Sequence, residues 1–142
     1  MGIKDSNNMG AAMAPAVLDT LVSHFKDTDR NPSYYDGIFT GDLGYVGKEI
    51  LIDLMQTKGY NIKNNYNDCG VLIFDKEQQD THSGGSGCGC IASVFSGYLF
   101  KQLKDKKFKK ILLVATGALT NSTTSQQGES IPSIAHAVSI EI

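Results

Sequence analysis

With 142 residues, the chain is long enough to bury the core of one domain without disulfides or a structural metal. Its formal charge of −2 argues against a dedicated nucleic-acid binder, and no apolar run approaches the ~18 residues of a membrane-spanning helix. The three cysteines are an odd number, which favours reduced thiols and a cytoplasmic compartment.

The first half of the chain predicts two helices around a short strand. Apolar residues recur every four positions over residues 9–25, but Pro15 breaks this stripe, so the regular helix is predicted to start near Pro15. Gly37–Gly41 is a strand candidate, and Gly44–Lys58 is predicted to be a helix with its apolar residues inward. Gly59 follows where helices commonly end on a glycine.

The second half predicts three more strands. Cys69–Phe74 is an apolar run bounded by turn residues, as in a strand buried on both faces. Lys110–Thr116 is the strongest strand signal, and Ala135–Ile142 alternates in part. Since no helix is predicted in the polar loop Leu119–Pro132, the last strand should return antiparallel. The whole pattern indicates an α/β layer with a mostly parallel sheet, and its start on a helix suggests a piece of a longer protein.

A glycine-rich turn followed by a helix, at residues 80–103, is the most distinctive stretch. A turn of this kind points free N–H groups at whatever lies in front of it, which favours an anion; tight helix packing without a ligand is the alternative. No Gly-Lys-Ser/Thr closes the turn, so it is not a P-loop. Asp75–His82 is too polar to be the strand of a dinucleotide-binding turn. We expect the helix Gly84–Leu103 to be the most enclosed one, packed on the sheet and on whatever completes the fold.

Three segments resemble, in order, the carboxy-terminal half of the thiolase superfamily: Met9–Ala16, Thr81–Gly87 and Ala115–Leu119. A closer resemblance is to a non-enzymatic branch, the stage V sporulation protein AD family of spore-forming bacteria. The motifs that carry it are Asn7–Ala16, Thr40–Gly44, His82–Cys90, Ala115–Ala118, Ser130–Pro132 and Ile134–Val138. The resemblance covers essentially the whole chain, but only the carboxy-terminal part of a considerably longer family member.

The resemblance implies a single thiolase-like half domain over residues 1–142, with a mostly parallel sheet and an antiparallel last strand. It implies a sporulation protein that binds dipicolinic acid and supports its uptake, as the calcium chelate, into the developing spore. The implied partners are the missing amino-terminal half, other stage V sporulation membrane proteins and further copies of the chain, with no nucleic acid. The implied location is the cytoplasm, in peripheral association with the spore inner membrane.

Most groups that thiolase chemistry requires are missing from this sequence. The nucleophilic cysteine of the superfamily belongs to the amino-terminal half, and Ala115 stands where the resemblance places the base of biosynthetic thiolases. Thr40–Gly44 stands where decarboxylating relatives carry a histidine, so only His82 remains. We therefore expect no catalytic residue and no cofactor. Two alternatives stay open: an acyl-CoA condensing or thiolase-type acyltransferase part, and a pure dimerisation or assembly module.

The binding site that the resemblance implies lies where a strand end faces the glycine-rich turn. Its residues are His82, Ser83, Ser86, Thr116, Gly117 and Ala118. They offer N–H donors, hydroxyls and one imidazole to a planar dicarboxylate. His82 is either such a donor or a side chain satisfied by backbone within a tight turn.

Other polar residues have two interpretations each. The pair Cys88–Cys90 either holds a metal or fills a crowded helix start; the usual zinc spacings are missing, and we expect no metal. Asp42 either binds a metal or caps the following helix. The six lysines within residues 101–110 either touch anionic lipid or form a solvated helix end. We expect His24 and His136 to be structural.

Overall fold

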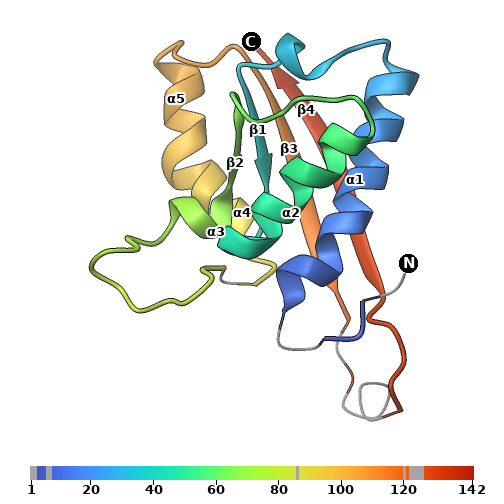
Figure 1. Cartoon of the computed structure of the whole chain (residues 1–142). Coiled ribbons are helices and arrows are strands. Elements are labelled where there is room, and N and C mark those ends of the chain that lie inside the picture. The colour runs from blue at the N-terminus through green and yellow to red at the C-terminus, as the bar shows by residue number, and fades with distance from the viewer. Residues whose placement is uncertain (1–2, 6–7, 86, 120, 122–126) are drawn as a thin grey trace.

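A computed structural model describes the whole chain except residues 1–2, 6–7, 86, 120 and 122–126 (Figure 1). Its elements are α1 (Met9–Asp27), the 3₁₀ turn η1 (Pro32–Tyr34), β1 (Gly37–Thr40), α2 (Gly44–Thr57), β2 (Tyr66–Asp68), α3 (Cys69–Leu72), α4 (Cys90–Val94), the π-helical turn η2 (Phe95–Leu99), α5 (Phe100–Lys104), β3 (Lys110–Ala118) and β4 (Ser133–Glu141). Within the described residues, no helix is both long and apolar enough to cross a membrane.

The described strands form one sheet in the order β2-β1-β3-β4. β1 runs parallel to β2 and to β3, whereas β3 and β4 pair antiparallel from Lys110 opposite Glu141 to Ala118 opposite Ser133. The predicted α/β fold, a mostly parallel sheet with an antiparallel last strand, is confirmed.

Helices cover both faces of the sheet, with α1 and α2 on one face and α4 to α5 on the other (Figure 1). Side chains alternate between the two faces along each strand, so neighbouring residues belong to different layers of the core. Ile38 and Leu112 pack under α1 and α2, whereas Phe39 and Leu113 pack under Val94 and the residues that follow it. This double burial explains why the two central strands, β1 and β3, read as largely apolar runs.

The prediction of a strand at Cys69–Phe74 is wrong. The third parallel strand is β2, which ends at Asp68, and the apolar run forms α3 and a turn. The Asp68 side chain accepts a hydrogen bond from the backbone N–H of Gly70, as an N-cap does, which ends the strand and starts a helix. Short apolar runs do not distinguish a strand from a buried helical turn by periodicity.

The first helix begins at Met9 and not near Pro15, as we had predicted. Asn8 caps it by accepting a hydrogen bond from Ala11 N–H, and Pro15 lies inside the helix. Packing holds this first turn in place, because a Cβ on Gly10 would lie 2.0 Å from the Leu43 carbonyl oxygen and one on Gly47 would lie 2.8 Å from Gly10 Cα. α1 and α2 therefore cross in backbone contact, and tertiary packing outweighs the local cost of the proline.

The prediction that the Gly84–Leu103 helix is the most enclosed one is also wrong. The helical segment begins only at Cys90, and its outward side leaves Tyr98 46% and Phe100 51% exposed. Only one of its sides packs on the sheet, through Val94, Leu99 and Leu103. α1 is the more enclosed helix, since residues along its whole length are buried.

Candidate functional site

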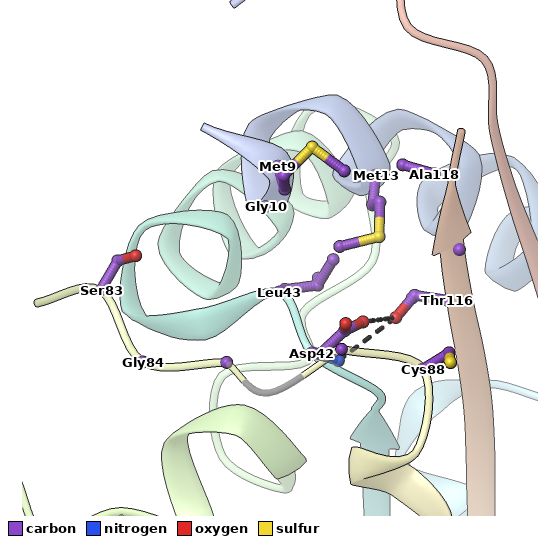
Figure 2. A pocket seen from close by; sticks show the side chains of 13 residues that line it. Met9, Gly10, Met13, Asp42, Leu43, Ser83, Gly84, Cys88, Thr116 and Ala118 are labelled. Carbon is purple, nitrogen blue, oxygen red and sulfur yellow. Dashed lines mark hydrogen bonds between the residues drawn. The ribbon is translucent and has the colours of Figure 1, made fainter. Parts of the chain in front are cut away.

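A cavity of about 460 Å³ opens at the carboxyl ends of β1 and β3. Ligand sites in sheets of parallel strands commonly lie at this end. The start of α1, the loop after β1, the glycine-rich turn and the end of β3 all contribute to its wall. Figure 2 shows the larger side chains around it, Met9, Met13, Leu43, Asp42, Thr116 and Cys88.

A paired carboxylate and hydroxyl form the polar wall of the cavity (Figure 2). Thr116 Oγ1 donates to Asp42 Oδ1 at 2.5 Å and accepts from Asp42 N–H at 3.2 Å. A Cβ on Gly41 would lie 2.5 Å from Thr116 Oγ1, so glycine is required for this approach. Among the described lining residues, Asp42 is the only Asp, Glu, Lys, Arg or His.

Asp42 does not cap the helix that follows it, which corrects one of our two interpretations. The N-cap residue of α2 is Leu43, whose side chain makes no capping hydrogen bond. The backbone N–H groups of Leu43 and Gly44, at the start of this helix, instead donate to the side chain of Asp68 at the end of β2. The capping role therefore lies with a residue distant in sequence, which no local pattern indicates.

Asp68 is fully buried and accepts four hydrogen bonds. Oδ2 accepts from Thr40 Oγ1 at 2.5 Å and from Leu43 N–H at 2.9 Å, and Oδ1 accepts from Gly44 N–H at 2.9 Å and Gly70 N–H at 3.0 Å. Burial raises the pKa of this carboxyl above its ordinary value, and the four hydrogen bonds oppose that shift in part. Asp68 was not among the predicted site residues; the available signal was its Asp-x-Gly spacing, which is typical of a turn or a helix start.

The glycine-rich turn is held against these loops by its backbone. Tyr45 N–H donates to the Ser83 carbonyl at 2.6 Å, and Gly85 N–H donates to the Gly70 carbonyl at 3.1 Å. The close packing that we gave as an alternative to anion binding is thus present at this part of the turn. It is absent at Gly87 and Gly89, where nothing lies within 4 Å of an added Cβ.

The structure brings together four of the six predicted site residues. Ser83, Gly117 and Ala118 line the cavity together with Thr116. His82 has a φ of +50° and a side chain that is 88% exposed, and its ring nitrogen lies 3.4 Å from Asp80 in a hollow separate from the cavity. Ser86 lies outside the described residues.

The cysteines occupy different environments. Cys88 lines the cavity and is exposed, whereas Cys90 and Cys69 are buried. Burial raises the pKa of the Cys69 thiol, which suits a packing role. No group of three or more His, Cys, Asp or Glu residues in the described part of the chain could hold a metal ion.

Two histidines and the lysine-rich segment lie away from the cavity. His24 is structural, as expected: its Nε2 lies 2.6 Å from the Tyr35 hydroxyl, and burial followed by the charge of Arg30 lowers its pKa. His136 is exposed on β4. The Lys110 ammonium lies 4.0 Å from the Tyr34 ring, and the other lysines of the segment are exposed around the end of α5.

Comparison with known proteins agrees with the resemblance found in the sequence. Residues 1–141 match the family model described as Stage V sporulation protein AD (SpoVAD). A curated relative, Stage V sporulation protein AD of Bacillus subtilis (strain 168), is 48% identical over 141 residues, which cover 99% of this chain and 41% of that protein. The chain thus spans less than half the length of this relative. A family match over nearly its entire length shows that the chain belongs to the stage V sporulation protein AD family.

Proposed function

We propose that the cavity forms part of a binding site for dipicolinic acid, a planar dicarboxylate. In this proposal the protein is a non-catalytic sporulation protein that supports uptake of this acid into the developing spore. One observation carries the proposal. The strand end Thr116–Ala118 and Ser83 of the glycine-rich turn, both expected at such a site, border the same cavity.

The size and lining of the cavity support a small, flat ligand. Its volume of about 460 Å³ falls within the roughly 300–1,000 Å³ of small-molecule sites. Met9, Met13 and Leu43 offer apolar atoms to the faces of an aromatic ring, and thioethers adapt well to such contacts. The hydroxyl of Ser83 and the backbone at the end of β3 offer polar groups to its edge.

The charge of the cavity favours the calcium chelate over the free dianion. Asp42 is hydrogen-bonded to a hydroxyl and has no cationic partner among the other described lining residues, so its negative charge is not neutralised there. A chelated calcium ion presents to this carboxylate a hard cation that prefers oxygen ligands. A free dicarboxylate meets only repulsion from it.

The same arrangement supports a non-catalytic role and opposes the acyltransferase alternative. Acyl transfer needs a nucleophile within hydrogen-bond reach of a base. Cys88 lines the cavity, but His82 lies in a separate hollow, and Ala115 cannot take up a proton. In the described part of the cavity, no histidine stands beside the thiol, and the Asp42 carboxylate is hydrogen-bonded to Thr116.

The assembly alternative has an observation of its own. Leu72, Ile73, Val94 and Tyr98 border an apolar hollow of about 270 Å³ on the outer side of α3 and α4. We propose that the amino-terminal part of longer family members, or a second copy of the chain, covers this hollow. The exposed lysines around α5 suit peripheral contact with the anionic inner membrane of the spore and with stage V sporulation membrane proteins.

Calorimetric titration of a full-length family protein carrying this sequence tests the function. Pyridine-2,6-dicarboxylate with calcium should bind, and Ser83→Ala should weaken binding at least about tenfold, because one hydrogen bond to a charged group is worth roughly 1.5–3 kcal/mol. Ser96→Ala, on the outer side of η2, is the matched control and should leave the affinity unchanged. If neither the free acid nor its calcium chelate binds, the proposed function is excluded. His82→Ala tests the predicted donor that lies apart from the cavity: weaker binding would show that His82 donates to the ligand, and unchanged affinity that it does not.

A further inference from the structure

A buried carboxylate that does not line the cavity nevertheless connects its walls. Asp68 lies at the end of β2 with no exposed surface, and its four hydrogen bonds reach three different segments. Thr40 ends β1, Leu43 and Gly44 start α2, and Gly70 belongs to α3.

Two of those segments in turn hold the glycine-rich turn. Gly44 precedes Tyr45, whose N–H donates to the Ser83 carbonyl, and the carbonyl of Gly70 accepts from Gly85 N–H. In both cases the hydrogen bond to the glycine-rich turn involves a residue that Asp68 binds, or the residue next to it. On the other side Leu43, which donates directly to Asp68, lines the cavity.

These connections transmit small displacements because backbone lies directly on backbone. A Cβ on Gly44, whose φ is +67°, would lie 2.3 Å from the Ser83 carbonyl oxygen, and one on Gly70 would lie 2.7 Å from Gly85 Cα. No side chain stands between the two layers to absorb a shift. A movement of the Asp68 carboxylate therefore moves both walls.

We infer that Asp68 is the positioning residue of this cavity: its carboxylate sets the spacing between the loop after β1 and the glycine-rich turn. The connection to ligand affinity rests on the proposed function, whereas the coupling between the two loops does not. Thr40 orients the carboxylate from behind, with the Tyr66 hydroxyl 2.8 Å from Thr40 Oγ1.

The chemistry requires a carboxylate and not an amide. Two oxygens accept three backbone N–H groups and one hydroxyl. In Asp68→Asn one oxygen becomes an NH₂ group, which in either orientation of the amide faces at least one backbone N–H group and leaves that buried donor unpaired. Thr40→Val is the matched control, because it removes a hydrogen bond to the same carboxylate but keeps all three backbone donors.

Amide hydrogen exchange on the chain tests the coupling without any ligand. With both variants compared at equal global stability, exchange at Tyr45 and Gly85 should be at least about tenfold faster in Asp68→Asn than in Thr40→Val. Neither amide touches Asp68, so a purely local effect would leave them protected. If the exchange rates of these two amides rise only as much as the loss of global stability predicts, the inference is overturned. Should Asp68→Asn fail to fold, Gly70→Ala displaces Gly85 directly and should expose its amide in the same way.

Calorimetry with pyridine-2,6-dicarboxylate and calcium on the full-length protein tests the consequence for binding. Asp68→Asn should weaken binding at least about tenfold, whereas Thr40→Val should stay within about threefold of the unsubstituted protein. Unchanged affinity in Asp68→Asn overturns the positioning role. If the unsubstituted protein binds neither form, the proposed function fails, and the exchange experiment still decides whether Asp68 couples the loops.

Discussion

At the scale of single residues, Asp42 sets the charge of the proposed site. Its carboxylate accepts a hydrogen bond from Thr116, and no Lys, Arg or His lines the described part of the cavity. Two like charges about 4 Å apart at an effective dielectric of about 20 repel by roughly 4 kcal/mol. A site of this charge distinguishes a bare anion from one that carries a cation.

Asp42→Asn should therefore reverse the preference between ligand forms. We expect tighter binding of free dipicolinate, because a negative charge is removed, and weaker binding of the calcium chelate, because an oxygen ligand is lost. Calorimetry with and without calcium measures both affinities. Asp80→Asn, beside His82 and outside the cavity, is the control. An unchanged ratio of the two affinities would mean that Asp42 does not face the ligand.

At the scale of elements, the start of β3 is tied to the start of β1 by Asp36. Its Oδ2 accepts from Lys109 N–H at 2.6 Å and from Lys110 N–H at 3.0 Å. These two backbone hydrogen bonds lower the pKa of Asp36 below its ordinary value of 3.8. A lowered pKa in the folded state means that the ionised carboxylate stabilises the fold.

This stabilisation should be lost in acid. It is fully present above the unfolded-state pKa of 3.8 and disappears as the pH falls through the lower folded-state value. Asp36→Asn should therefore lower the thermal midpoint at neutral pH and flatten its decline below about pH 4. Thermal unfolding between pH 2 and 7 measures both effects, with Asp53→Asn, exposed on α2, as the control. Parallel pH profiles for the two variants would contradict the assignment.

At the scale of the whole molecule, the outer side of α3, α4 and η2 carries an apolar surface. Leu72 is 36%, Ile73 42% and Tyr98 46% exposed around the same hollow. Gly97 also borders the hollow, and the space in front of it is open, since nothing lies within 4 Å of an added Cβ. Contiguous exposed apolar surface commonly marks an interaction site.

We expect the chain on its own to self-associate through this surface at micromolar concentrations. Tyr98→Glu should shift the mass measured by light scattering toward the monomer, because a charge is costly to bury in an apolar contact. Val46→Glu is the control: Val46 is 43% exposed but lies on α2 and does not border the hollow. A stable monomer of the unsubstituted chain, or equal effects of the two variants, would contradict this assignment.

What the sequence by itself determined are the elements whose signal is local and long. Lys110–Thr116 and the helix from Gly44 have strong periodic patterns, and both are found where predicted, as β3 and α2. The antiparallel last strand followed from the absence of a helix in the preceding loop. Of the cavity, Ser83 and Thr116–Ala118 could be identified because a parallel strand end and a glycine-rich turn were expected to face each other.

What only the tertiary structure decided depends on contacts between distant segments. Cys69–Phe74 is no strand because Asp68 ends β2 while binding the start of α2, a pairing that no local window contains. Met9 and Met13 reach the cavity because Gly10 and Gly47 let two helices cross in backbone contact. His82 lies apart from the other predicted residues: its backbone has a positive φ, and it borders a separate hollow with Asp80. Sequence periodicity reports which side of an element is buried, whereas the choice of partner depends on close approaches that are made only once the chain has folded.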